Sequence, residues 1–447
     1  MAAGATVDSL MLTAGRAVAE AVRRLAAHAD ILVACGTGNN GGDGYVAAAA
    51  LRDMGLDVRV VALGEPRSDA ATAARSRWMG PVEPLLTANP AAILVDAVFG
   101  TGLTRALKPE LAAALARLSS AARLTISVDL PSGVTTDTGV VPGEAVIADV
   151  TLALGAVKPS HLLVPAAGHC GAVRLLDIGL RPNLGTALRV AQRPDFLKTP
   201  GPSAHKYTRG MVAVVAGAMP GAAELSAQAA LRAGAGYVLL LGDTGTTVPH
   251  AVVRREYSAG SLADKRIGAV VIGPGLGRDA TAASLLDDAV RTDTLLIIDG
   301  DALQLLDLAR LAKVRLRSAP TIMTPHEGEF DAVFGKSDSP RIERALTAAR
   351  DTGAIVVLKG SSTIIASPEG AAIVTPSADG WLSTAGTGDV LTGAIAAVIA
   401  AQDIRHIPLI DRVAAGAWLH SQAARRLPGA FLADDLAHAL SAVRAAL

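Results

Sequence analysis

Short apolar runs alternate with longer alanine-rich stretches along nearly the whole chain of 447 residues. Short runs rich in β-branched residues suit strands buried on both faces, and the longer stretches between them suit crossover helices. This alternation predicts an α/β fold with mostly parallel sheets covered on both faces. The predicted strands are Ile31–Ala34, Val58–Ala62, Ile93–Val95, Thr125–Val128, Val150–Leu154, Met211–Ala216, Tyr237–Leu241, Ala269–Ile272, Leu295–Ile298, Thr321–Met323, Ile355–Leu358 and Thr363–Ala366. The predicted helices are Ala14–Ala27, Tyr45–Met54, Pro109–Leu118, Ala222–Ala233, Ala280–Ala289 and Pro340–Thr352, with a helical tail over Leu419–Leu447.

The chain is too long for one ordinary hydrophobic core, so more than one domain is expected. The segment Ala191–Lys206 holds three prolines and mixed charges without an apolar period, which is typical of a boundary. We therefore predict two doubly wound domains, residues 1–192 and residues 193–447.

Composition excludes several classes of protein. Hydrophobic residues make up 51% of the chain, yet the longest apolar runs are far shorter than the ~20 residues of a membrane span. The chain shows no basic segment followed by an apolar stretch at its start, so we expect no secretory signal, no membrane partner and a cytoplasmic location. The 41 basic and 41 acidic residues balance, and aromatic residues are only 3%, which argues against a nucleic-acid partner. The two cysteines, Cys35 and Cys170, suit reduced thiols, and the nine histidines lack the spacing of a zinc site.

A Gly-rich segment near the C-terminus, Ser383–Asp389, leads directly into the apolar stretch Val390–Ala400. Its two glycines leave amide N–H groups uncovered, and the helix expected after it directs its positive end at the same place. Asp389 beside such an anion site could take a proton from a hydroxyl as a phosphoryl group arrives. The alternative is a plain helix cap after a turn. The combination favours a phosphate-handling site.

A second Gly-rich segment, Cys35–Gly44, follows the first predicted strand and satisfies a GxGxxG pattern. Alone, this pattern would suggest a dinucleotide site with Asp53 or Asp57 on the ribose. The amide pair and the carboxylate within it instead suit a cation, or a ligand with both donors and acceptors. Asp96 and Asp129 each follow another predicted strand and precede a Gly-containing turn. Because ligands in open parallel sheets bind outside the carboxyl ends of the strands, we expect these groups to form one oxygen-rich cluster.

Three segments of the first half together resemble the YjeF N-terminal domain, the family of the NAD(P)H-hydrate epimerases. They are Gly38–Tyr45, Asp96–Gly102 and Asp129–Gly133, and Lys158-Pro159 also fits. The resemblance implies a Rossmann-like domain in which Asp129 is the acid–base group and Asn40, Asp96 and Ser132 hold a potassium ion. It also implies that the hydrated nicotinamide nucleotide contacts Asn39, Asn40, Gly41, Gly42, Asp43, Gly100, Thr101, Gly102, Leu103, Thr104, Arg105, Ala106 and Asp129. The family usually has a longer segment before the helix that contains Ala14-Gly15, where this chain has Met1–Leu12.

The second half carries a series of motifs at predicted strand ends. They are His205–Gly210, Gly217–Ala223, Ile272–Gly277, Ile298–Leu303, Thr324–Phe330 and Val356–Thr363, followed by the Ser383–Asp389 segment. His326, Glu327 and Glu329 have the composition of a metal site, but their spacing in a loop points the side chains apart, so metal is the weaker interpretation. Asp299 and Asp301 are candidate site residues or, with equal weight, solvated caps.

In this order, the motifs resemble the YjeF C-terminal, ribokinase-like domain, the family of the NAD(P)H-hydrate dehydratases. The resemblance implies that Ala222, Gly275, His326 and Asp389 contact the substrate, and that Lys359, Gly360, Ser361, Ser362, Thr363 and Gly388 bind ADP or ATP with Mg²⁺. Asp389 would activate the hydroxyl of the hydrated ring, phosphate would leave, and NADH or NADPH would be restored.

The sequence thus predicts a bifunctional enzyme that acts on NADHX and NADPHX and assembles as a homo-oligomer. Three alternatives stay open. The chain could be a small-molecule kinase with a regulatory nucleotide-binding domain, or a dehydratase only, with a catalytically inactive first domain. It could also be a binding or scaffold protein whose first half has lost catalysis.

Overall fold

The computed structural model describes residues 6–180, 188–242, 249–376 and 380–447. The chain divides into two compact units, Met1–Gly185 and Thr186–Leu447, which we describe separately. Among the described residues, no helix is both long enough and apolar enough to cross a membrane.

The first unit is a seven-stranded parallel sheet with the order β3-β2-β1-β4-β5-β6-β7. Alternate residues of its strands face opposite sides, so that Ile31 and Val33 pack against the helices α1 to α3 while Leu32 packs against α4. The strands are β1 (Ile31–Cys35), β2 (Val58–Ala62), β3 (Val82–Pro84), β4 (Ile93–Ala97), β5 (Leu124–Val128), β6 (Val150–Leu154) and β7 (Ala172–Leu176). The helices are α1 (Val7–Ala26), α2 (Asn39–Asp53), α3 (Asp69–Arg75) and α4 (Pro109–Ala121), with 3₁₀ turns η1 (Leu85–Thr87), η2 (Pro159–His161) and η3 (Ala166–His169).

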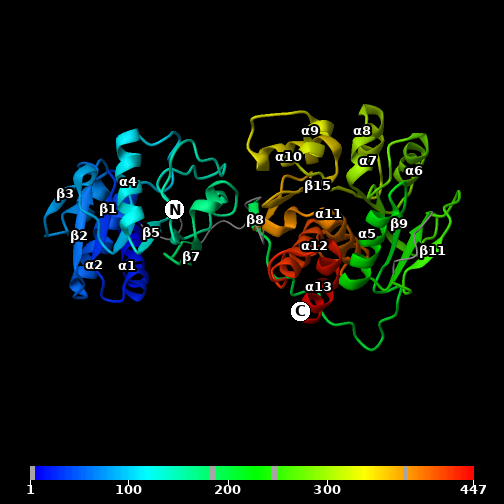
Figure 1. Ribbon diagram of the computed structural model, residues 1–447, viewed down its shortest axis with the longest axis horizontal. Coiled ribbons are helices and arrows are strands. Elements are labelled where there is room, and N and C mark those ends of the chain that lie inside the picture. Colours follow the sequence, from blue (N-terminus) through cyan, green and yellow to red (C-terminus); the bar gives the residue numbers. More distant parts are fainter. Residues whose placement is uncertain (1–5, 181–187, 243–248, 377–379) are drawn as a thin grey trace. The chain divides into compact units, whose positions relative to one another are not determined.

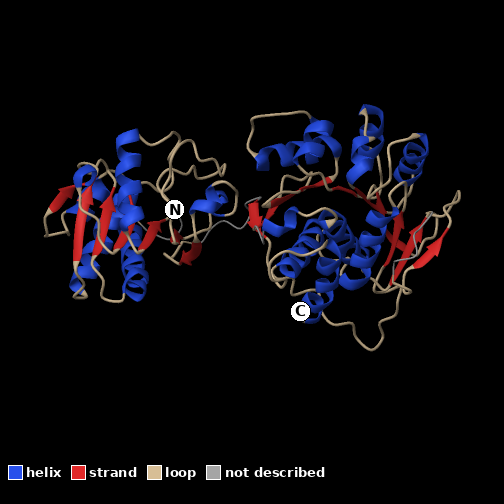
Figure 2. Ribbon diagram, in the orientation of Figure 1, coloured by secondary structure: helices blue, strands red, loops and turns tan. Residues whose placement is uncertain are grey.

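The second unit is a ten-stranded sheet with the order β11-β10-β9-β12-β13-β14-β15-β16-β17-β8 (Figures 1 and 2). Its pairs are parallel except β15 with β16 and β16 with β17. The strands are β8 (Leu188–Val190), β9 (Met211–Val215), β10 (Tyr237–Leu241), β11 (Val253–Arg255), β12 (Ile267–Ile272), β13 (Leu295–Ile298), β14 (Thr321–Met323), β15 (Ile355–Leu358), β16 (Thr363–Ala366) and β17 (Ala372–Thr375).

Helices cover both faces of the second sheet. α5 (Pro220–Ala233), α11 (Thr387–Ala400), α12 (Leu409–Ala424) and α13 (Ala433–Ala445) share one hydrophobic core with residues of β9 and β12. α6 (Ala280–Val290), α7 (Gly300–Gln304) and α8 (Leu308–Arg315) pack on the other face. Figure 1 shows α9 (Glu327–Phe334) and α10 (Arg341–Thr352) on that same side, and η4 (Gly380–Ser383) precedes α11.

The predicted α/β architecture with two parallel-sheet domains is confirmed. Three details differ from the sequence-based expectation. The second helix begins at Asn39 rather than Tyr45, because the glycines of this segment let its first turns pack closely against the sheet. The tail is two helices, α12 and α13, interrupted around Pro428 and Gly429. Short edge strands, such as β3, β8 and β11, were not predicted.

The boundary between the units also lies earlier than the predicted division after residue 192. β8 pairs with β17, and the N–H of Ala191 donates to the carbonyl of Val374 at 2.9 Å. These residues therefore belong to the second sheet.

Candidate active sites

Glycines bring the start of α2 into contact with the end of the sheet in the first unit. A Cβ on Gly36 would lie 1.9 Å from the carbonyl oxygen of Val98, and one on Gly41 would lie 1.9 Å from the carbonyl oxygen of Gly36. No larger residue fits at either position without moving backbone. The amides and carboxylate of Asn39–Asp43 are thus held beside the carboxyl ends of β1 and β4, where parallel sheets bind ligands.

Two of the three predicted potassium ligands, Asp96 and Ser132, contact each other, and Asp96 is fully buried. Asp96 accepts hydrogen bonds from the Ser132 hydroxyl at 2.6 Å, the Ser132 N–H at 2.8 Å, the Ser127 hydroxyl at 3.1 Å and the Val98 N–H at 3.2 Å. Burial nevertheless raises the pKa of Asp96 above its usual value, against these hydrogen bonds. Nδ2 of Asn40 is buried without a hydrogen-bond partner among the described residues. One carboxylate, one hydroxyl and one amide provide the oxygen donors and the single negative charge that a monovalent cation requires.

Asp43 and Asp129 form the acidic part of this site. Asp43 is 8% exposed, and its burial, reinforced by the negative charge of Asp129, raises its pKa well above the usual range. Asp129 lies immediately after β5 and is 6% exposed. Its carboxylate forms an ion pair with Lys158, and its carbonyl oxygen lies 2.7 Å from Nε2 of His161. Sequence reasoning included Lys158 in the family resemblance without giving it a role in the site, and it did not name His161.

The predicted loop Gly100, Thr101, Gly102, Leu103, Thr104, Arg105 and Ala106 meets this cluster at one end. A Cβ on Gly100 would lie 2.8 Å from Oδ1 of Asn40 and 3.4 Å from Cβ of Asp129. Most of the remaining loop is exposed. Asn39 faces elsewhere, because its Oδ1 accepts a hydrogen bond from the Ser68 hydroxyl at 2.6 Å, before α3. The structure therefore groups Asn40, Asp43, Gly100 and Asp129, while Asn39 lies at the margin.

In the second unit, Asp389 lies in the first turn of α11, after Gly386, whose φ is +88°. Behind it, Nζ of Lys359 contacts Oδ1 of Asp299 at 2.7 Å and Oε2 of Glu329 at 3.7 Å. The hydroxyl of Thr392, one turn after Asp389, donates to Oδ2 of Asp299 at 2.8 Å. Asp299 is 2% exposed, so its interpretation as a solvated cap is wrong. Asp301 is not a solvated cap either, since it accepts hydrogen bonds from the Gly277 N–H at 3.0 Å and from Arg278 at 2.8 Å.

These charges perturb one another strongly. Burial raises the pKa of Asp389 to about 7, and the charges of Asp299, Glu329 and Asp301 add to this effect against Lys359. For Lys359, burial opposes the charged form, yet Asp299 and Glu329 outweigh it and raise the pKa. Asp389 is therefore a carboxyl group whose ionisation falls near neutral pH, where a general base is effective.

A pocket of about 550 Å³ opens beside these residues. It is lined by predicted nucleotide-contacting residues Lys359, Gly360, Ser361, Thr363 and Gly388, by His326, and by residues of α12 that were not predicted, including Ala417, His420 and Ser421. Nε2 of His420 lies 3.0 Å from the carbonyl oxygen of Thr387, and burial lowers the pKa of His420 to about 4. A neutral imidazole thus secures the first residue of α11. Ser362 does not line the pocket; it is fully buried, and its carbonyl oxygen accepts a hydrogen bond from Arg341 at 2.9 Å.

Of the remaining predicted substrate residues, His326 lines this pocket, whereas Gly275 and Ala222 do not. His326 caps α9, with Oε2 of Glu329 accepting from its N–H at 2.8 Å, and its side chain is 60% exposed. Gly275 has a φ of +59° and accepts a hydrogen bond from the Met219 N–H at 2.8 Å, before α5, which contains Ala222. α5 in turn contacts α11, since the Ser226 hydroxyl donates to the carbonyl of Asp389 at 2.9 Å. Among the described residues, no group of His, Cys, Asp or Glu side chains is arranged to hold a metal ion alone.

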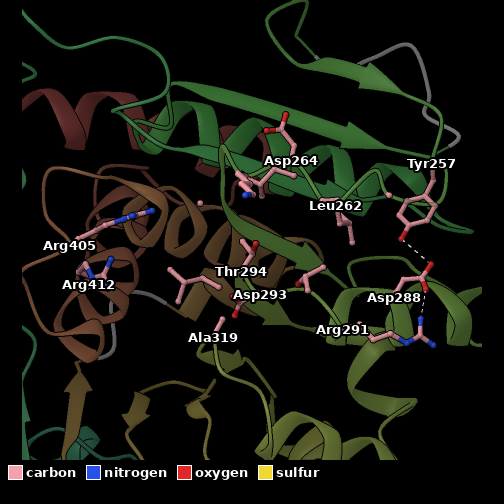
Figure 3. A pocket seen from close by; sticks show the side chains of 17 residues that line it. Tyr257, Leu262, Asp264, Asp288, Arg291, Asp293, Thr294, Ala319, Arg405 and Arg412 are labelled. Atoms are coloured by element: carbon pink, nitrogen blue, oxygen red, sulfur yellow. Dashed lines mark hydrogen bonds and ion pairs between the residues drawn. The ribbon is translucent and has the colours of Figure 1, made fainter.

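Figure 3 shows a different pocket, of about 860 Å³, whose lining includes Ile267 and Leu295 at the amino ends of β12 and β13. None of the predicted site residues lines it. Its carboxylates have partners of their own; Asp288, for example, pairs with Arg291 at 2.6 Å and accepts from Tyr257 at 3.3 Å. This pocket is separate from the two predicted sites.

The fold and the two sites define a two-domain α/β enzyme. One unit carries an acid–amide cluster at its strand ends, and the other carries a buried carboxyl group, Asp389, in the first turn of a helix beside a pocket. Comparison with known proteins identifies the family. Residues 7–160 match the family model described as "YjeF-related protein N-terminus", and residues 212–444 match the model described as "NAD(P)H-hydrate dehydratase".

Whole-length relatives agree with these matches. The bifunctional NAD(P)H-hydrate repair enzyme of Mycobacterium leprae is 37% identical over 396 residues, which cover 87% of this chain and 81% of that protein. The Escherichia coli enzyme of the same name is 31% identical, over 97% of this chain and 88% of that protein. A ribokinase-like superfamily protein from Enterococcus faecalis shares the fold of the second unit, with a TM-score of 0.50 and 23% identity over 60% of this chain. The chain belongs to the family of bifunctional NAD(P)H-hydrate repair enzymes.

Proposed function

We propose that the first unit interconverts the R and S forms of hydrated NADH and NADPH, and that the second unit converts the (6S) form back to NADH or NADPH. The second reaction consumes ADP, or ATP, and with ADP it releases AMP and phosphate. The observation that carries this proposal is Asp389, a base with a pKa of about 7 in the first turn of α11, beside Lys359 and a pocket of about 550 Å³.

In the proposed dehydration, Asp389 accepts the proton of the hydroxyl on the hydrated ring carbon. The oxygen of that hydroxyl attacks the terminal phosphoryl group of ADP, so that the O–P bond forms as the bond to AMP breaks. The backbone N–H groups at the start of α11 receive the negative charge on the phosphoryl oxygens. Phosphate then leaves with the C–O bonding electrons, a proton is lost from the adjacent ring carbon, and the ring double bond is restored. NADHX and ADP thus give NADH, AMP and phosphate.

The charges around Asp389 suit a nucleotide that arrives with Mg²⁺. Asp299, Glu329 and Asp301 surround the base, with Lys359 as the cation that contacts two of them. Such a set of carboxylates repels free phosphate groups, whereas a divalent cation bound to the phosphates reverses the interaction. Lys359 and the backbone of Gly360 and Ser361 would then contact the nucleotide at the pocket wall.

In the proposed epimerisation, Asp129 exchanges a proton with the substrate beside Asp43, which favours its protonated form. Asn40, Asp96 and Ser132 would hold a potassium ion, which would neutralise the buried Asp96 carboxylate and order the loop that begins at Gly100. Gly41 and Gly42 would act through the backbone, since both are packed against the protein, and Asn39 would contact the nucleotide only at the margin of the site. The predicted homo-oligomer and cytoplasmic location stay predictions, and sedimentation in solution tests the former.

One assay tests both activities. The protein is incubated with chemically hydrated NADH, ADP and Mg²⁺, and recovery of the reduced nicotinamide is followed by its absorbance at about 340 nm. We expect both R and S fractions to be recovered. Asp389→Ala should abolish recovery while R/S exchange continues, and Asp129→Ala should recover only the S fraction. If neither fraction is recovered with ADP or ATP, the proposed dehydration is wrong, and if wild type recovers the S fraction alone, the proposed epimerisation is wrong.

A further inference from the structure

Asp129 has an unusual backbone for an aspartate. Its φ is +66°, and the N–H of Leu130 donates to the carbonyl of Val128 at 2.8 Å across it. A hydrogen bond between residues two apart, around a centre of positive φ, defines the rare and strained form of the γ-turn. Such a conformation is strained and persists only where neighbouring groups enforce it.

His161 is one of those neighbours. Nδ1 of its ring accepts a hydrogen bond from the backbone N–H of Lys158 at 2.9 Å, and its Nε2 lies 2.7 Å from the carbonyl oxygen of Asp129. An acceptor at Nδ1 places the ring proton on Nε2, so Nε2–H donates to Asp129. The ring is 5% exposed, and its burial lowers its pKa, which favours this neutral form. The N–H of Asp129 is also bound, to the carbonyl of Leu152 at 2.8 Å.

Lys158 acts on the side chain of the same aspartate. Its Nζ donates to Oδ1 of Asp129 and to the carbonyl of Leu154, the latter at 2.8 Å, and the Leu154 N–H donates to Oδ1 at 3.1 Å. Both hydrogen bonds to the carboxylate thus go to Oδ1. No described residue donates to Oδ2, and this second oxygen is left for a substrate.

We propose that Lys158 and His161 are positioning residues of the epimerase site, which together hold Asp129 with Oδ2 directed for proton transfer. Lys158 fixes the carboxylate, and His161 fixes the strained backbone and, through the N–H of Lys158, the segment that carries the lysine. This inference rests on the proposed epimerase function. Beyond that function, we infer that Lys158 and His161 affect the rate of R/S exchange without having to touch the substrate.

The test compares two replacements of His161. His161→Leu keeps most of the volume but removes the donor, whereas His161→Gln supplies an amide N–H that can reach the Asp129 carbonyl. The substrate is purified R-form hydrated NADH with ADP and Mg²⁺, and excess Asp129→Ala chain serves as the coupling dehydratase. We expect His161→Leu to lower kcat for exchange by about 10- to 100-fold at an unchanged KM, because small misplacements of a reacting group have effects of this size. His161→Gln should recover much of the loss, and His28→Asn, at an exposed position beyond the end of α1 whose positive φ asparagine tolerates, should leave kcat unchanged.

Lys158→Met gives a second, independent arm. It should also lower kcat, because Oδ1 loses its cation and the carboxylate can rotate. An exchange rate equal to wild type for His161→Leu or for Lys158→Met would overturn the proposed positioning role. A His161→Gln variant as slow as His161→Leu would overturn it as well. A wild-type protein that exchanges no R form is a different result, which removes the epimerase function itself. An unchanged KM shows that a slow variant still has a folded site.

Discussion

At the scale of single residues, the proposed dehydration depends on the ionisation of Asp389. Its pKa of about 7 arises from burial and from three neighbouring carboxylates. The same environment that brings this pKa near neutral pH also makes the ionised form of Asp389 costly in free energy of folding. Two predictions follow from this one group, one for rate and one for stability.

The first prediction concerns the pH dependence of dehydration. A general base must be ionised to accept a proton, so kcat/KM should rise with pH and level off above about pH 7, where Asp389 in the free enzyme is ionised. The measurement is the initial rate of (6S)-NADHX dehydration at low substrate concentration between about pH 5 and pH 9. A profile that is flat through this range would contradict the assignment of Asp389 as the base.

The second prediction concerns the free energy of unfolding of Asp389→Asn. Because the folded-state pKa lies above the ordinary value, the unfolded chain ionises first as pH rises, and the folded state loses stability until it ionises near pH 7. The free energy of unfolding of the asparagine variant should therefore equal that of wild type at about pH 4. At pH 8 it should be about 2–4 kcal/mol larger than that of wild type. Denaturant unfolding at both pH values measures the difference. An equal gain at both would show that packing, not charge, is responsible.

At the scale of elements, two glycines let α5 and α12 pack closely against α11, the helix that carries Asp389. A Cβ on Gly393 would lie 2.2 Å from the carbonyl oxygen of Ser226 in α5, and one on Gly416 of α12 would lie 2.6 Å from Cα of Ile395. The helix pattern of Val390–Ala400 was predictable from its composition. The order in which α5, α11 and α12 pack was not, since it depends on contacts between residues far apart in the chain.

Gly393→Ala should therefore destabilise the second unit by roughly 1–3 kcal/mol, because overpacking at this crossing forces α5 and α11 apart. We expect dehydration to slow as well, since Ser226 also bonds the carbonyl of Asp389. Thermal unfolding and the dehydration rate measure the two effects. The matched control is Gly221→Ala in the first turn of α5, where an added Cβ meets nothing within 4 Å, and it should stay within about 0.5 kcal/mol of wild type. Equal effects of both substitutions would contradict this account.

At the scale of the whole molecule, one parallel sheet and one mostly parallel sheet form two compact units with separate cores. The second sheet ends in β8, whose residues precede the predicted division after residue 192. β8 covers the edge of β17, and Arg189 of β8 pairs with Asp411 of α12 at 2.7 Å.

A chain of residues 186–447 should consequently unfold at a higher temperature than a chain of residues 193–447, because the shorter piece leaves the edge of β17 without its partner. Both should be measured by thermal unfolding, and the longer piece should keep the dehydration rate of the full chain. The same Tm for both pieces would show that β8 adds no stability. An inactive longer piece would show that the second unit requires the first.

The fold class and the positions of the candidate site residues depend on short stretches of sequence, so they could be predicted from the sequence. Alternating apolar runs fixed the α/β class, because burial on both faces demands apolar strands. Asp96 and Asp129 at strand ends, and Asp389 after a Gly-rich segment at the start of a helix, indicated where to look for the sites, because parallel strands and helix N-termini are places where ligands bind.

Only the tertiary structure decided how those groups behave. The burial of Asp299 against Lys359, the pKa of Asp389, the strained turn at Asp129 and the ring of His161 beneath it all arise from residues distant in sequence. Electrostatic energies depend on separation in space and on exclusion of water, and neither is encoded in the spacing of residues along the chain. The sequence therefore named most of the proposed reacting groups, whereas packing within each unit set the charges and orientations of these groups.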